Sequence, residues 1–166
     1  MKEPLFRRRG FGKMPKAVFY IEGKHVQDVG LRIVLTEKIL HAGFAKGGVF
    51  NLPDGRVEVV LEDADAEKIT SFHKKVEENL VAWLESSAEN KERLKRLIGN
   101  PGIRVSKIEF NDKILVLDVG LYSHSLELNQ LSKGIDVYYD LMESLKEFRT
   151  AIAGLQGAVN GVQAKL

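Results

Sequence analysis

Apolar and polar positions alternate with two different periods along residues 16–120, and the changes of period predict an α+β domain. A period of two is typical of a strand and a period near 3.6 of a helix. The expected elements are strand 17–23, helix 31–43, strands 44–51 and 56–62, a helix beginning at 63–65, a short helix 87–98, and strands 103–110 and 113–119. This order predicts a ferredoxin-like two-layer sandwich, in which an antiparallel sheet carries both main helices on one face.

Turn and cap residues support these boundaries. Gly43 stands where the first helix should end, and Asp54-Gly55 supplies a turn with a left-handed glycine between the second and third strands. Asp63 or Asp65 is expected to cap the second helix. Asn111-Asp112 is expected at a tight turn between the last two strands.

The pattern changes after about residue 126, where a seam of apolar residues is spaced alternately four and three apart. The seam residues are Leu131, Ile135, Tyr138, Met142, Leu145, Phe148, Ile152, Leu155, Val159, Val162 and Leu166. Such spacing is typical of a coiled coil, with one irregular step at Leu145. A single helix over 131–166 would be about 54 Å long, more than one small domain can cover. A break or hairpin near Gly154 is the competing interpretation, because glycine disfavours helix.

Composition narrows the classes of function. The chain has 166 residues, no cysteine and a net charge of +2, so disulfides, thiolate metal sites and cysteine nucleophiles are excluded. This charge gives no reason to expect nucleic acid as a partner, and no apolar run approaches the length of a membrane span. We therefore expect a cytoplasmic protein. The four histidines show no metal-ligand spacing, so neither a metal nor a cofactor is expected.

Two motifs carry the candidate chemistry. The first is a polar loop that runs into a helix: Val26-Gln27-Asp28-Val29-Gly30-Leu31-Arg32. The second is Gly47-Gly48-Val49-Phe50-Asn51, continued by Asp54-Gly55-Arg56-Val57-Glu58. A loop before a helix, with a guanidinium in the first turn, is suited to holding an anion. Taken alone, Arg32 could be an ordinary solvated residue and Asn51 an ordinary turn residue.

With these motifs at this spacing, residues 16–118 resemble the acylphosphatase family, interrupted by a helical insertion near 85–100. The resemblance implies a metal-free hydrolase of acyl phosphates. Arg32 and the loop amides of residues 26–31 would hold the phosphate, and Asn51 would orient the attacking water. A planar guanidinium and consecutive N–H groups suit a dianion, and an amide side chain can both accept from and donate to water.

The first motif departs from the family pattern in three places. Asp28 replaces a glycine and brings a negative charge toward the expected phosphate, which predicts weakened binding. Leu31 replaces an aromatic residue. One extra residue follows Gly23, and we prefer this insertion because the gapless alternative would turn Glu22 into the core.

The predicted organisation is an N-terminal arm at 1–15, an acylphosphatase-like domain at 16–120, and a helical, coiled-coil-like tail at 127–166. The expected partners are a small acyl phosphate or phosphate anion and, through the tail, further copies of the chain. The alternative function is a non-catalytic anion-binding module of the same fold on an oligomerising helix.

Overall fold

The structure is a computed structural model that describes residues 14–88, 91–99 and 102–163, the last seven of these by their backbone alone. It divides into two compact units, residues 1–123 and 124–166. Most of the arm expected at residues 1–15 and the last three residues of the tail lie outside the described residues. The boundaries of the predicted domains stay a prediction.

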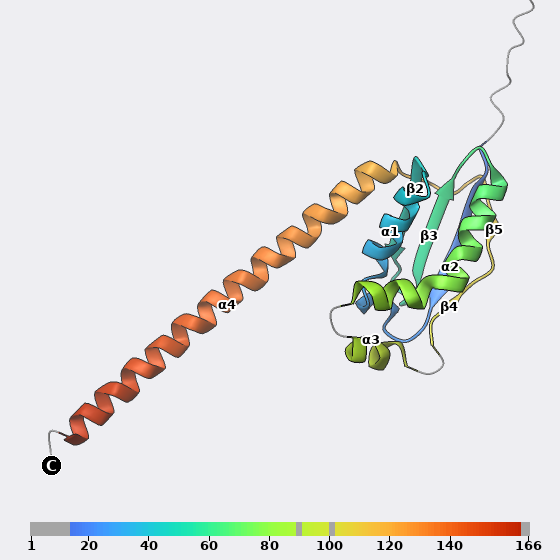
Figure 1. The fold of residues 1–166 in the computed structure, drawn as a ribbon. Helices are drawn as coiled ribbons and strands as arrows, with labels where there is room; N and C mark the ends of the chain where they lie inside the picture. The colour runs from blue at the N-terminus through green and yellow to red at the C-terminus, as the bar shows by residue number, and fades with distance from the viewer. Residues whose placement is uncertain (1–13, 89–90, 100–101, 164–166) are drawn as a thin grey trace, which may run out of the picture. The chain divides into compact units, whose positions relative to one another are not determined.

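The first unit is built on an antiparallel sheet whose strands follow the order β2-β3-β1-β4, with β5 also paired to β1 (Figure 1). The paired strands are β1 (Lys16–Glu22), β2 (Lys46–Asn51), β3 (Val57–Glu62), β4 (Arg104–Val105) and β5 (Glu109–Phe110). The helices α1 (Leu31–His41) and α2 (Ala66–Ser87) cover one face of the sheet, and α3 (Lys91–Ile98) follows α2. This is the ferredoxin-like α+β fold that the sequence predicts, and the long C-terminal helix is present as well.

The core lies between the sheet and the two main helices. Alternate residues of β1, β2 and β3 face it. The buried residues include Ala17, Phe19, Ile21, Val49, Val57, Val59 and Leu61 from the sheet and Leu31, Leu35, Ile39, Ile69, Phe72, Val76 and Leu80 from the helices. Burial of each large apolar side chain stabilises the fold by about 1.5–3 kcal/mol. Ile21 is fully buried, whereas Glu22 stays outside and pairs with Arg104 at 2.9 Å. This is the register that an insertion after Gly23 predicts.

Capping and turn residues mark the ends of helices and strands at the positions that the sequence predicts. The carboxylate of Asp65 accepts hydrogen bonds from the N–H groups of Glu67 and Lys68, at 2.9 and 3.2 Å, and so caps α2. Gly43 after α1 has φ 73°, and Gly55 in the β2–β3 turn has φ 89°. Both values lie in the left-handed region, which glycine adopts without the steric cost of a Cβ.

The predicted strand 103–110 is interrupted in its middle. β4 and β5 both pair with β1, and Ser106 lies between them. The Ser106 hydroxyl accepts a hydrogen bond from the Tyr20 N–H at 2.8 Å, and its carbonyl is 2.8 Å from Nε2 of the buried His73. Where the regular ladder is broken, the Ser106 side chain therefore satisfies the Tyr20 N–H, and the His73 side chain satisfies the Ser106 carbonyl.

The predicted strand 113–119 is wrong. Residues 111–118, here called the connector, link one edge of the sheet to the other. The connector begins with a turn in which the Asn111 side chain accepts from the Lys113 N–H at 3.0 Å. It ends beside β2, where the Gly47 N–H donates to the Leu117 carbonyl at 2.9 Å and Asp118 bridges Lys46. The apolar alternation of a strand is present, but only the end of the connector reaches a free strand edge.

The helix α4 (Val119–Gln163) has 45 residues, so it is about 67 Å long. It begins eight residues before the expected start at 127, with the Asp118 carboxylate accepting from the Leu121 N–H at 2.9 Å. The helix continues through Gly154, so the alternative of a hairpin at that residue is wrong.

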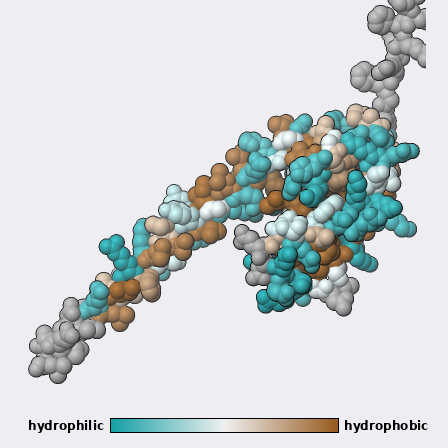
Figure 2. Space-filling view, in the orientation of Figure 1, coloured by the Kyte–Doolittle hydropathy of each residue, from teal (hydrophilic) through white to brown (hydrophobic). Residues whose placement is uncertain are grey.

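Apolar side chains are exposed along α4, as the brown surface in Figure 2 shows. None of the helices in the described part of the chain is long and apolar enough to cross a membrane.

Candidate functional site

The loop between β1 and α1 is fixed at both ends by buried side chains. Val26 and Leu31 each expose 1% of their surface, so they contribute to the core and present only their backbone to a ligand. Between them, Asp28 and Gly30 are exposed, and Gln27 and Val29 are half-buried. Gly30 has φ 80°, and no atom lies within 4 Å of the position that a Cβ would occupy there. The backbone at Gly30 therefore borders open space.

The start of α1 supplies backbone donors next to this space. The N–H groups of Ile33 and Val34 both donate to the Gly30 carbonyl, at 3.1 and 3.2 Å. The N–H groups of Leu31 and Arg32 are the first two of the helix, which have no acceptor within the helix itself. Together with the helix dipole, these two N–H groups favour an anion at this end of α1.

Gln27 joins the two sequence motifs. Its Nε2 donates to the Leu52 carbonyl at 2.7 Å and to the Arg56 carbonyl at 2.9 Å. Both carbonyls belong to the turn that follows Asn51, so one amide connects the loop before α1 to the end of β2. The sequence places Gln27 in the loop but does not predict this link. The two carbonyls belong to residues 25 and 29 positions further along the chain.

Arg32 and Asn51 lie on the two segments that Gln27 connects. Arg32 is half-buried in the first turn of α1, and Asn51 is the exposed last residue of β2. Within the described residues 14–88, 91–99 and 102–163, neither side chain forms a hydrogen bond or an ion pair with a protein group. Both polar groups are therefore available to a ligand.

Tyr122, in the first turn of α4, contacts β2. Its hydroxyl donates a hydrogen bond to the Val49 carbonyl, and its ring centroid is 5.1 Å from that of Phe50. Burial raises the pKa of Tyr122, and the positive charge of Arg32 opposes part of this rise. Sequence reasoning missed Tyr122, because it started the tail helix after this residue.

Asp28 is paired within the loop. Its Oδ2 lies 3.1 Å from Nδ1 of His25, and both side chains are largely exposed. His25 has φ 58° and is the one residue other than glycine with a positive φ in the part of the chain that the structure describes. The pairing means that the carboxylate has a neighbour able to offset its charge.

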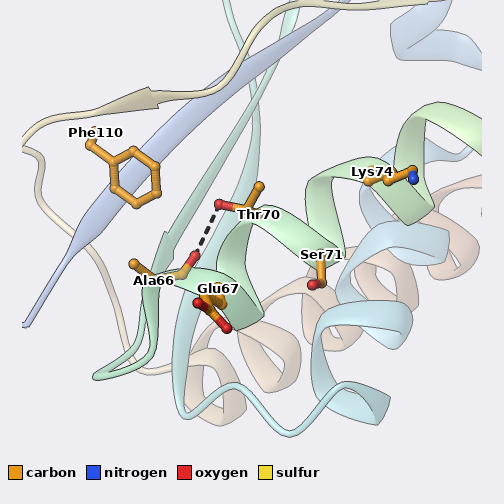
Figure 3. Close-up of a pocket in the computed structure, with 6 residues that line it drawn as sticks. All are labelled: Ala66, Glu67, Thr70, Ser71, Lys74 and Phe110. Atoms are coloured by element: carbon orange, nitrogen blue, oxygen red, sulfur yellow. Dashed lines mark hydrogen bonds between the residues drawn. The ribbon is translucent and has the colours of Figure 1, made fainter.

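A separate shallow hollow of about 440 Å³ lies between the first two turns of α2 and Phe110 of β5 (Figure 3). It is lined by Ala66, Glu67, Thr70, Ser71, Lys74 and Phe110. The Thr70 hydroxyl donates to the Ala66 carbonyl of its own helix at 3.0 Å, and Glu67 and Lys74 bring opposite charges. None of the site residues expected from the sequence lines this hollow.

Comparison with known proteins supports an acylphosphatase-like domain. Over 49 residues, 30% of this chain, the sequence is 49% identical to an acylphosphatase from Thermus thermophilus. The matched stretch spans about half of that relative, 53% of its length. No protein-family model matches the chain.

Proposed function

We propose that residues 16–120 form a hydrolase that cleaves the carboxyl–phosphate bond of small acyl phosphates. The observation that carries the proposal is the link made by Gln27, which joins the loop before α1 to the turn after Asn51. Because of this link, the N–H groups at the start of α1 lie on segments connected to Arg32 and Asn51, whose side chains have no partner within the part of the chain that the structure describes. The partial likeness to an acylphosphatase supports the same conclusion.

Each group has a defined part in the proposed reaction. The N–H groups of Leu31 and Arg32 hold phosphate oxygens, together with those of the loop other than Asp28, whose N–H donates to the His25 carbonyl at 2.9 Å. The Arg32 guanidinium offers two parallel donors to the same dianion. The Asn51 amide accepts a hydrogen bond from a water and fixes its oxygen toward phosphorus. The water oxygen bonds to phosphorus as the bond from phosphorus to the acyl oxygen breaks. A carboxylate leaves, and the protons of the water pass to phosphate and solvent.

Such a reaction requires no strong base, because a carboxylate is already a good leaving group. Positioning of the water and stabilisation of the charge on the phosphoryl oxygens can provide the rate enhancement. This is consistent with a site whose expected groups are hydrogen-bond donors and an amide.

The alternative is an anion-binding module that does not catalyse. The observation that favours it is the carboxylate of Asp28 within the loop, since a negative charge there opposes a phosphate dianion. In that case the domain would bind a less charged anion and leave acyl phosphates intact.

Hydrolysis of benzoyl phosphate in the presence of a chelator separates the two functions. We expect turnover in the wild type and a loss of about 10²–10³-fold in Arg32→Ala and in Asn51→Ala, the size found when one stabilising donor is removed. Arg149→Ala at an exposed helical position and Asn79→Ala at a half-buried one are matched controls and should retain wild-type turnover. Turnover at the uncatalysed rate in the wild type would reject the enzyme and leave the binding module.

We also propose that α4 associates with α4 of a second copy through its seam. Eight seam residues have described and exposed side chains: Leu131, Ile135, Tyr138, Met142, Leu145, Phe148, Ile152 and Leu155. At roughly 100 Å² each they offer about 800 Å², which is what one partner contributes to an interface of standard size. An identical helix presents the same repeat at the same spacing, and this favours a second copy as the partner.

Sedimentation of the full chain at micromolar concentration should therefore give a dimer or larger species. Leu145→Glu should shift the protein toward the monomer, whereas Lys133→Glu, a larger change of charge away from the seam, should not. A monomeric wild type would reject self-association. A truncation after Ser125 keeps Tyr122 and should give a folded monomer.

A further inference from the structure

The outer edge of β2 is fastened by the segment that leads into α4. β2 lies at one end of the strand order, so one of its edges has no neighbouring strand. Because the backbone groups of a strand point alternately to its two edges, the N–H of Gly47 and the carbonyl of Val49 face the same way. The Gly47 N–H donates to the Leu117 carbonyl at 2.9 Å, and the Val49 carbonyl accepts from the Tyr122 hydroxyl. The connector and the first turn of α4 therefore hold this edge as far as Val49.

Asn51 lies two residues beyond this point. Val49 is fully buried against the helices, and alternate residues of a strand share a face, so the Asn51 side chain lies on the helix side of the sheet. α1, whose first turn carries Arg32, is one of the helices on that face (Figure 1). Phe50 points to the opposite face, and its ring centroid is 5.1 Å from that of Tyr122. Tyr122 thus contacts both of the residues that immediately precede Asn51.

The chain that follows Asn51 is held as well. Gln27 donates to the carbonyls of Leu52 and Arg56 in the β2–β3 turn. Gln27 belongs to the stretch that resembles the acylphosphatase family, whereas Tyr122 belongs to α4 and lies outside that stretch. The position of the Asn51 amide therefore depends on two side chains, one before it and one after it, from different parts of the chain.

We propose that Tyr122 is a positioning residue for acyl phosphate hydrolysis: its hydroxyl fixes the end of β2 and, through the strand, the Asn51 amide that orients the attacking water. This inference rests on the proposed function, which gives Asn51 that part. Tyr122 acts through the backbone and needs no contact with the substrate. It adds to the site a contribution of α4 that the two sequence motifs do not contain.

Orientation of the water is the step that this contact should affect. A displacement of about 1 Å from the productive geometry can cost about 10²-fold in rate. Loss of one hydrogen bond should allow a smaller displacement, so we expect kcat to fall by about tenfold. The phosphate is held by groups of α1 and of the loop before it rather than by β2, so KM should change by less than about twofold.

The test is hydrolysis of benzoyl phosphate by the full chain, with kcat and KM measured separately for the wild type and for Tyr122→Phe. Phenylalanine keeps the ring beside Phe50 and removes only the hydroxyl. We expect a lower kcat at an unchanged KM. A higher KM with an intact kcat would indicate an effect on phosphate binding and would overturn the inference, and so would wild-type values of both constants.

Ser106→Ala is the matched control at the opposite edge of the sheet. It also removes one hydroxyl that satisfies a backbone group, the Tyr20 N–H at 2.8 Å, so it should lower the free energy of unfolding by an amount similar to that in Tyr122→Phe. Its kcat should stay within about twofold of the wild-type value. Equal losses of kcat in the two variants would show that reduced stability is the cause and would overturn the inference.

The double variant Tyr122→Phe/Asn51→Ala identifies the residue through which Tyr122 acts. If the hydroxyl serves to place the Asn51 amide, its removal should cost less than about twofold once that amide is absent. In the Arg32→Ala background the same removal should still cost about tenfold. A tenfold loss in the Asn51→Ala background as well would contradict the proposed path through Asn51.

NMR gives a readout that does not depend on turnover. The Phe50 N–H belongs to the same peptide group as the Val49 carbonyl, so its ¹⁵N resonance should shift in Tyr122→Phe and not in Ser106→Ala. An unmoved resonance would overturn the inference even in an active protein. If the wild type hydrolyses benzoyl phosphate and Tyr122→Phe is equally active, only the inference fails. If the wild type does not hydrolyse it, the proposed function fails, and the inference fails with it.

Discussion

Gln27→Ala should loosen the connection between the loop before α1 and the β2–β3 turn. In the wild type, the side-chain amide donates to the carbonyls of Leu52 and Arg56. Alanine removes both hydrogen bonds without adding bulk or charge. The change therefore isolates the contribution of this one amide to the fold and to the candidate site.

The expected loss of unfolding free energy in Gln27→Ala depends on the hydrogen bonds that the two carbonyls keep. The Leu52 carbonyl still accepts from the Gly55 N–H at 3.1 Å, and the Arg56 carbonyl from the Leu52 N–H at 2.9 Å. Neither oxygen is left without a partner, so the cost is the net value of two hydrogen bonds, about 2 kcal/mol in total. Gln27→Glu should cost more, because a carboxylate would face two carbonyl oxygens and has no donor to offer them.

Urea unfolding followed by the fluorescence of Trp83 is the appropriate assay. Trp83 is the one tryptophan of the chain and packs against the core of the first unit, so it reports on that unit rather than on α4. Asn79→Ala is the matched control, because it removes a hydrogen bond that the Asn79 side-chain amide donates to the Lys75 carbonyl within α2. It should change the free energy of unfolding by less than about 0.5 kcal/mol. If Gln27→Ala and Gln27→Glu both stay within that range, the two bonds do not hold the loop.

Two further predictions concern the pKa of Tyr122 and the backbone of Gly30. Burial raises the pKa of Tyr122 in the folded protein, so the stability it contributes is complete below pH 10, the ordinary value, and falls as pH rises further. Tyr122→Phe should therefore reduce the loss of unfolding free energy between pH 9.5 and 11 in urea titrations, with part remaining because burial also raises the pKa of Tyr20. An unchanged loss would show that Tyr122 is not the buried group responsible. Gly30→Ala should cost about 1 kcal/mol through its φ of 80° alone, since no atom crowds the new Cβ. Gly47→Ala should cost more in the same urea assay, because its Cβ would lie 3.2 Å from atoms of Ile39, Val60 and Leu61. The reverse order of the two costs would contradict this explanation.

The parts of the fold that the sequence predicts are those that neighbouring residues determine. The cap at Asp65, the left-handed turns at Gly43 and Gly55, and the inward register of Ile21 each depend on local chemistry or on a period of two. The connector was misjudged because the choice of a strand partner is not local. Its Leu117 meets Gly47, 70 residues earlier in the chain, and nothing near residue 117 indicates that.

The same limit applies to the candidate site. The motifs predict that a loop and a strand end belong together, but not that Gln27 is the side chain that connects them. Tyr122 was missed because its position depends on α4 beginning at Val119, whereas the apolar seam becomes regular only later. The hairpin alternative arose from the cost of glycine in a helix, about 1 kcal/mol each. In the structure, the helix continues through Gly154 despite this cost.

The way the connector covers β2 affects the tendency of this protein to aggregate during expression and storage. β2 is an outer strand, and the connector meets its edge at Lys46 and Gly47, with Val119 of α4 bonding to Ala45 just before the strand. If the connector detaches, the donors and acceptors of β2 become a template for strand addition by another chain, the usual route to ordered aggregates. Fragments that end before residue 117 should consequently aggregate during expression, although they contain every strand of the sheet. Thioflavin T fluorescence of a fragment ending at residue 112, compared with one ending at 125, would reveal this.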